Sequence, residues 1–206
     1  MTRTASSHER LVRMTSTAIL AAIIIAFTFI PYVGYIVYGG LSITTLHIPV
    51  ILGAIVLGPG AGLILGTVWG ITCLIYAAMN GTADAIIFLN PLISVLPRIL
   101  VGYLAGWYYV WLRKLFAGRA SAKGGKTAAI SSAVLTSAFG TLTNTVLVLT
   151  AIQLFGSDGL FSLQAVFKNI ISVAVTVNGI VELVAAIILC TAISQALFRG
   201  RVLKSN

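Results

Sequence analysis

The stretch LHIPVILGAIVLGPGAGLILGTVWGITCLI, which runs from Leu46 to Ile75, contains no Asp, Glu, Lys or Arg. Its two apolar parts are separated by Gly58-Pro59-Gly60, a combination that forces a tight turn. We therefore predict a short helix over Leu46–Leu57 and a longer one over Ala61–Ala78. Pro49 fits the first turn of the short helix, because the missing N–H of proline has no helical partner there. Charge-free helices in succession are typical of a chain that lies in a membrane.

The rest of the chain has the same character. Of its 206 residues, 13 are Lys or Arg and 4 are Asp or Glu, while 59% are hydrophobic. A soluble domain has roughly a quarter of its residues charged. The composition therefore excludes a soluble enzyme, a disordered chain and a fibrous repeat. The net charge of +9 does not indicate nucleic-acid binding, because the basic residues gather at the ends of predicted helices.

We predict an all-α membrane protein, with one six-helix bundle over residues 1–206 as a single domain. The short helix Leu46–Leu57 is the least certain to cross the membrane fully, and the fourth helix is interrupted by Pro91 and Pro97. The Gly- and Tyr-rich segment Pro31–Thr45 is predicted to be a loop at the membrane interface. The predicted helices are Met14–Ile30, Leu46–Leu57, Ala61–Ala78, Ile86–Leu112, Thr127–Phe155 and Asn169–Leu197.

The basic residues predict the orientation of this bundle. They gather before the first helix, in the loop from Arg113 to Lys126, and after the sixth helix. With six crossings these three segments lie on one side, and the positive-inside rule assigns that side to the cytoplasm. Both termini are thus predicted to be cytoplasmic.

Ionisable groups deep in a membrane cost several kcal/mol unless they are paired or hydrated, so they indicate a functional site. Arg98 and Glu182 each lie about 18 Å from the outer end of their predicted helix, and Asn144 lies about 17 Å from its own. Asn178 precedes Glu182 by four residues and shares its helix face. One reading is a buried Arg98–Glu182 ion pair with the asparagines as interhelical hydrogen bonds. The other is a polar pocket, in which Arg98 binds an anion or an amide oxygen.

Three further side chains are weaker candidates for the same pocket. His47, beside Pro49, is more typical of an interface residue or a helix cap than of a ligand. Trp69 is as typical of bundle packing as of an apolar pocket wall. Asn90 precedes Pro91, where capping of the broken backbone is slightly favoured over ligand contact. The aromatic residues between Trp107 and Trp111 indicate an interface anchor at the inner end of the fourth helix.

The first helix has a stripe of small residues, Ala18, Ala22 and Ala26. A small-xxx-small pattern allows another helix to approach closely, either within the bundle or from a partner protein. The cysteines, Cys73 and Cys190, lie in apolar segments without metal-ligand spacing, so we predict no metal site. A Gly-rich phosphate loop and the motifs of proteases are also missing, so the chain itself has no evident route to ATP or to proteolysis.

The segment Leu46–Ile75 resembles the second and third helices of the substrate-binding S components of energy-coupling factor (ECF) vitamin transporters. The shared features are the Ile48-Pro49 pair, the following Gly-Ala, the Leu-Gly-Pro turn and a glycine-spaced helix. The segment LNPLISVLPRILVGYLAG, Leu89–Gly106, is similar to the fourth helix of the pantothenate-type members. The likeness extends over essentially the whole chain.

This resemblance implies a multi-pass protein of the bacterial cell membrane that is not an enzyme and binds a vitamin from outside. Its partners would be a transmembrane coupling protein and two cytoplasmic ATPases, which hydrolyse ATP, so that this chain needs no cofactor. The alanine stripe of the first helix matches the family's docking motif for the coupling protein. The family's pocket, built by the last three helices and the loop after the first, would contain Arg98, Asn144, Asn178 and Glu182.

The resemblance favours pantothenate, a hydroxylated amide with one carboxylate. Arg98 suits the carboxylate, and Asn144 and Asn178 suit the amide and hydroxyl groups. Glu182 argues against a simple anion site unless it pairs with Arg98. Pyridoxine, folate and riboflavin remain alternatives, although a riboflavin binder would be expected to have an acidic residue where Leu46-His47 stands. A membrane-embedded enzyme or a structural membrane protein is the alternative from another class.

Overall fold

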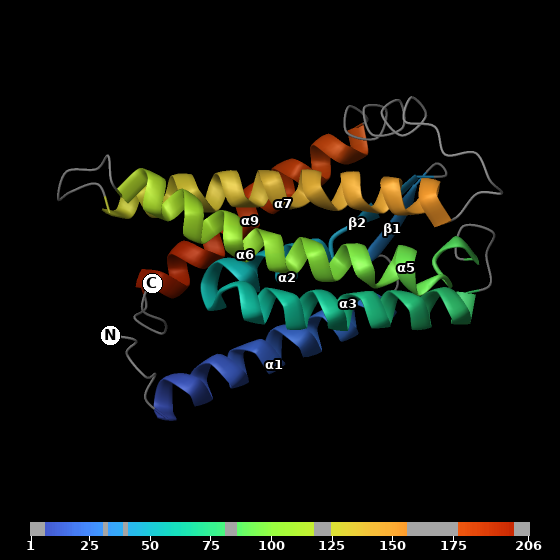
Figure 1. The fold of residues 1–206 in the computed structure, drawn as a ribbon, viewed down its shortest axis with the longest axis horizontal. Coiled ribbons are helices and arrows are strands. Elements are labelled where there is room, and N and C mark those ends of the chain that lie inside the picture. Colours follow the sequence, from blue (N-terminus) through green and yellow to red (C-terminus); the bar gives the residue numbers. More distant parts are fainter. Residues whose placement is uncertain are drawn as a thin grey trace.

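The computed structural model describes residues 7–30, 33–38, 41–80, 86–117, 125–155 and 177–199. Its helices run along the long axis of the molecule (Figure 1). The elements are α1 (Ser7–Phe29), β1 (Tyr35–Tyr38), β2 (Leu41–Thr44), α2 (His47–Leu57), α3 (Pro59–Asn80), α5 (Pro91–Ser94), α6 (Leu96–Ala117), α7 (Gly125–Phe155) and α9 (Val177–Arg199).

Five helical segments of the described chain are long and apolar enough to cross a membrane: those of α1, α3, α5–α6, α7 and α9. With the shorter α2 they make up the six helices that the sequence predicts, which confirms the fold class. Several helix ends differ from the prediction. The largest differences are that α1 begins at Ser7 rather than Met14, because the basic head continues the helix, and that α6 ends at Ala117 rather than Leu112. The fourth helix is divided at Val95, in agreement with the predicted interruption by Pro91 and Pro97. The predicted start of the sixth helix at Asn169 lies outside the described residues.

The central helix of the bundle is α2, which packs against α1, α3, α6, α7 and α9. Ten of its 11 residues are buried. At about 1.5 Å per residue it is roughly 16 Å long, well short of a bilayer core of about 30 Å. It does not cross the membrane by itself. Apart from His47 its residues are apolar or glycine on every face, as expected of a helix that is surrounded by protein.

The segment before α2 forms an antiparallel hairpin, with Tyr35 opposite Thr44. The predicted loop is therefore wrong for residues 35–38 and 41–44, which are strands. The Tyr35 ring stacks on Tyr76 of α3 with centroids 4.9 Å apart, and its hydroxyl is buried. Gly34 lies against the Phe27 carbonyl of α1, where a Cβ would collide. Tyr35 and Gly34 thus pack against α3 and α1, and β2 contacts α9.

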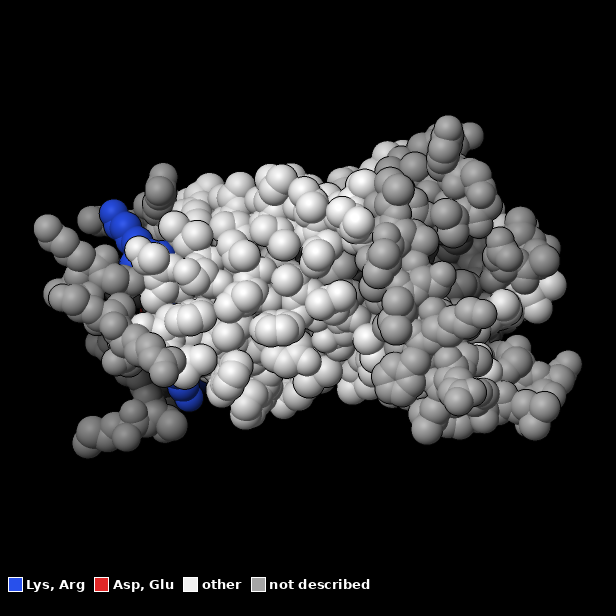
Figure 2. Space-filling model, turned by 90° about the horizontal axis from the view of Figure 1, so that it is seen from above, with Lys and Arg blue, Asp and Glu red and all other residues white. Residues whose placement is uncertain are grey.

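The starts of α1 and α7 and the ends of α6 and α9 lie at one end of the bundle, as the distribution of basic residues predicts (Figure 1). In the view of Figure 2, the described Lys and Arg side chains gather at one end, and the long middle face is uncharged. Near the start of α1, Arg13 donates a hydrogen bond to the Leu57 carbonyl at the end of α2. Gly58 follows with φ 94°, a left-handed conformation that favours glycine and allows α3 to begin at once.

Helices α3 and α6 approach so closely that their backbones touch. A Cβ on Gly62 would collide with the Gly102 carbonyl, and a Cβ on Gly102 would collide with the Gly62 carbonyl. Four residues further along α3, Gly66 lies against the Arg98 carbonyl in the same way. Small residues at such crossings are typical of membrane helices, because close van der Waals packing replaces the hydrophobic effect there. This crossing fixes the backbone of Arg98.

Candidate functional site

A break in the fourth helix positions the side chain of Arg98. In a continuous helix the Ile93 carbonyl would accept a hydrogen bond from residue 97, but Pro97 has no N–H to donate. The Arg98 guanidinium takes that place, because its Nη1 donates to the Ile93 carbonyl at 2.7 Å. At the other end of the short helix α5, the Asn90 side chain accepts from the Leu92 amide at 3.0 Å. Asn90 is thus an N-cap, which agrees with the reading that the sequence slightly favoured.

The Arg98 guanidinium lies among aromatic rings. It is 5.3 Å from the ring centroid of Trp69 in α3 and 5.2 Å from that of Phe88, distances typical of cation–π contacts. Arg98 is only 5% exposed, and its buried Nε has no hydrogen-bond partner. This cation is enclosed, held in place and still has a free donor.

Trp69 serves the bundle and this site at once. It is fully buried in an apolar cluster with Ile24, Leu46, Val50 and Leu65. Its ring also contacts the Arg98 guanidinium, so bundle packing of Trp69 is confirmed and its place in a ligand pocket stays a prediction.

Glu182, on α9, does not pair with Arg98 in the described structure. Its Oε1 accepts a hydrogen bond from the Thr44 amide at 2.5 Å, at the end of β2. The predicted ion pair is therefore wrong in this structure, because the hairpin provides the donor for the carboxylate. Half-buried, Glu182 instead connects the hairpin to α9.

Two further predicted residues are buried with unused polar atoms. Asn144 of α7 is 9% exposed, and its Oδ1 has no hydrogen-bond partner. His47 begins α2, is fully buried, and neither ring nitrogen has a partner of normal hydrogen-bond geometry. The interface and cap readings of His47 are both wrong, because its side chain is fully buried and the N-cap position of α2 is Leu46. Asn178 lies in the first turn of α9, and its side chain is outside the part of the chain that the structure describes.

Buried polar atoms without a partner are rare in folded proteins, and each calls for an explanation. Here they include a donor on Arg98, an acceptor on Asn144 and the imidazole of His47. In the described ranges no group of three or more His, Cys, Asp and Glu is placed to hold a metal ion. Unpartnered donors and acceptors of this kind are candidate contacts for a small polar ligand. Fold and site together define a membrane-embedded binding protein for a small solute.

The structure adds Tyr35, Thr44 and Phe88 to the predicted residues. Phe88 comes from the chain just before α5, and the other two come from the hairpin. Arg98 itself was found by its charge, but nothing local marks its neighbours, which come together only through tertiary packing. The sequence shows the tyrosines of the hairpin, but the preference of tyrosine for the membrane interface gives the wrong prediction for Tyr35.

Similarity to known proteins agrees with this description. Residues 12–194 match the family described as "ECF transporter, substrate-specific component". The pantothenic acid transporter PanT of Lactococcus lactis subsp. cremoris (strain MG1363) is 36% identical over 174 residues, which are 77% of this chain and 79% of that protein. The pantothenate transporter PanT of Leuconostoc mesenteroides subsp. mesenteroides is 33% identical over 113 residues, 52% of this chain and 55% of that protein.

The same fold is found in a crystal structure at 2.1 Å of the S component for biotin from an ECF-type ABC transporter. The TM-score is 0.61 with 17% sequence identity, and the match covers 94% of each chain. At this identity the likeness concerns the fold alone.

The chain belongs to the substrate-specific components of ECF transporters. It is a multi-pass membrane protein, and such components are binding subunits for transport, not enzymes. They bind a substrate and associate with an ECF energizing module.

Proposed function

We propose that this protein binds pantothenate with high affinity from outside the cell and delivers it to an ATP-driven ECF uptake system. The observation that carries the proposal is Arg98, a buried guanidinium with an unpartnered Nε between two aromatic rings. An Arg fork binds a carboxylate in a bidentate manner, and pantothenate has one carboxylate. The two pantothenate transporters that the chain resembles support the same substrate.

The rest of the pantothenate molecule is a secondary amide with two hydroxyl groups. The unpartnered Oδ1 of Asn144 is a suitable acceptor for an amide N–H or a hydroxyl, and Asn178 is a second amide for this role. His47 offers two further ring nitrogens, and Asn90 is used as a helix cap. Glu182 acts indirectly in this proposal, by tying the hairpin to α9 beside the ligand.

In this proposal, the alanine stripe of α1 docks on the transmembrane coupling protein. Ala18, Ala22 and Ala26 are all exposed in the described structure, so this stripe does not pack within the bundle. That observation favours the docking reading of the stripe over bundle packing. The coupling protein would connect the chain to two cytoplasmic ATPases, and this chain would bind no nucleotide or other cofactor of its own.

Calorimetry of the purified full chain in detergent tests the substrate. The panel consists of pantothenate, biotin, riboflavin, folate, pyridoxine and thiamine, each added to ligand-free protein. We expect binding of pantothenate alone. Because biotin and folate also have carboxylates, they show whether the site selects the whole molecule or only its charge. Binding of another vitamin without pantothenate, or of none, would refute the proposal.

A further inference from the structure

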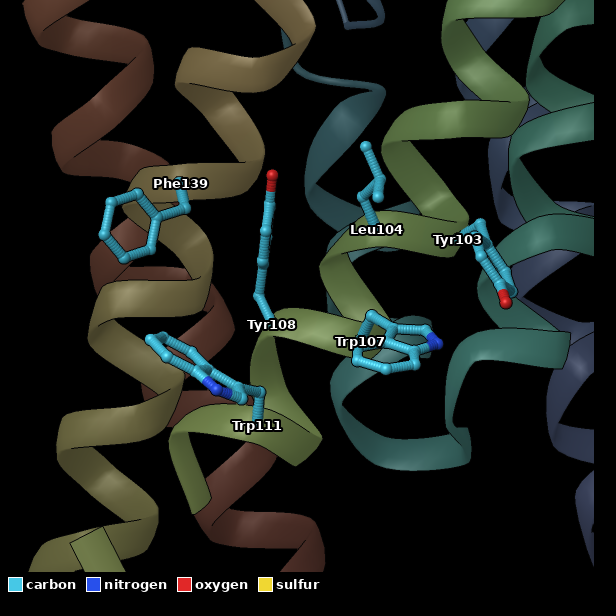
Figure 3. A pocket seen from close by; sticks show the side chains of 6 residues that line it. All are labelled: Tyr103, Leu104, Trp107, Tyr108, Trp111 and Phe139. Carbon is cyan, nitrogen blue, oxygen red and sulfur yellow. The ribbon is translucent and has the colours of Figure 1, made fainter. Parts of the chain in front are cut away.

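A groove of about 770 Å³ opens on the outside of the bundle between α6 and α7. Five of its lining side chains come from α6, and Phe139 comes from α7 (Figure 3). The Tyr108 ring lies between the two helices, 5.8 Å from the Phe139 ring. The groove is lined by Tyr103, Leu104, Trp107, Tyr108, Trp111 and Phe139.

This groove is separate from the site around Arg98 and opens toward the surroundings. Trp107 is 56% exposed and Trp111 is 54% exposed. Both belong to a membrane span, so the surface they expose faces lipid. Trp111 and Tyr103 lie about 9 Å and 21 Å from the end of α6 at Ala117, counted along the helix. The groove thus occupies the half of the bilayer next to the basic end of the bundle.

Exposed basic residues lie at the same end of α6 and α7 as the groove. Lys114 is exposed and follows Trp107 by seven residues, about two helical turns, so it continues the same face of α6. Arg113 donates to the Gly125 carbonyl at 3.2 Å, which joins the end of α6 to the start of α7. Lys126, also exposed, comes next in α7. The long stems of both lysines allow their ammonium groups to reach the headgroup level.

We infer that the α6–α7 groove is a binding site for an anionic phospholipid of the inner leaflet. One acyl chain would lie on the aromatic side chains of the groove, whose volume is within the range of about 300–1,000 Å³ for ligand sites. The phosphate would lie near Lys114 and Lys126. Opposite charge identifies the headgroup, because each basic residue near the surface favours an anionic lipid about fivefold.

Tryptophan quenching by brominated lipid tests this inference on the full chain. The protein is reconstituted in phosphatidylcholine vesicles that contain a small fraction of either brominated phosphatidylglycerol or brominated phosphatidylcholine. The chain has three Trp residues, and Trp69 is fully buried, so Trp107 and Trp111 report on the groove. We expect quenching by the anionic lipid to be at least twice that by the zwitterionic one.

Two variants separate a lipid site from unspecific exposure. In Lys114→Gln/Lys126→Gln the ratio of quenching by the anionic lipid to quenching by the zwitterionic lipid should fall to about one, while a matched Arg10→Gln change on exposed α1 leaves the ratio unchanged. Equal quenching by both lipids in the unaltered chain, or an unchanged preference in the double variant, would overturn the inference. Weak quenching by both brominated lipids would also overturn the inference, because the groove would then be covered by protein. Cross-linking of the Trp107→Cys variant would show whether a second copy of the chain covers it.

Discussion

Replacement of Arg98 by alanine tests the binding site most directly. The change removes the donor of the 2.7 Å hydrogen bond to the Ile93 carbonyl and both cation–π contacts. It also removes the charge that we assign to the vitamin carboxylate. The bundle itself should survive, because the backbone of Arg98 is held by the α3–α6 crossing and not by its side chain.

The expected loss of affinity follows from the burial of this charge. Truncation of one partner of a buried, hydrogen-bonded charge pair costs about 2–5 kcal/mol, which is roughly 30- to 4,000-fold in Kd. Arg98→Lys keeps the charge but loses the bidentate fork. Loss of one charge-assisted hydrogen bond costs about 1.5 kcal/mol, or roughly tenfold. The affinity for pantothenate should therefore decrease from the unaltered protein to Arg98→Lys and further to Arg98→Ala.

A change in the ligand makes the assay specific for the carboxylate. The alcohol analogue of pantothenate, in which a hydroxymethyl group replaces the carboxylate, has no partner for the guanidinium. The unaltered protein should bind pantothenate much more tightly than the alcohol, whereas Arg98→Ala should bind the two about equally. Calorimetry gives the four affinities of this cycle, and the difference isolates the pairwise interaction.

The result that refutes the reasoning is an Arg98→Ala protein that still prefers pantothenate over its alcohol by the original factor. The carboxylate would then lie elsewhere, and Arg98 would have only its structural contact with Ile93. Thermal unfolding in detergent checks that the variant is folded. Arg10→Ala, a change of the same type at an exposed position of α1, provides the matched control and should bind both ligands normally.

Three further changes test other parts of the structure. Glu182→Gln replaces a charged acceptor of the Thr44 amide by a neutral one, so stopped-flow measurements should show vitamin release about tenfold faster, and unchanged release would contradict the role of this contact. Ala22→Trp should abolish co-purification with the energizing module and leave the vitamin Kd within about twofold; loss of both would instead indicate bundle packing. Gly102→Val should destabilise the bundle by about 1–3 kcal/mol or more through overpacking, whereas Gly60→Ala, with open space around it, should not change the melting temperature.

Much of the membrane architecture could be predicted, because hydrophobicity and charge act locally along the chain. The turn at Gly58-Pro59 and the cap at Asn90 were predicted for the same reason. The hairpin was missed, since its tyrosines are as typical of the membrane interface as of a buried strand. The partner of Glu182 was missed as well, because Thr44 is 138 residues away in sequence.

The amino-acid sequence alone predicts that this chain is a membrane bundle, that its basic segments lie together at one end, and that Arg98 and Glu182 are ionisable groups within its spans. Those conclusions rest on the cost of burying charge, which depends on each residue and its close neighbours in the chain. Only the tertiary structure decided what Arg98 and Glu182 contact. Pro97 leaves a carbonyl for the guanidinium, and the packed hairpin brings an amide to the carboxylate. Each charge thereby has its own partner, and the buried Arg98 Nε has no hydrogen-bond partner in the described structure.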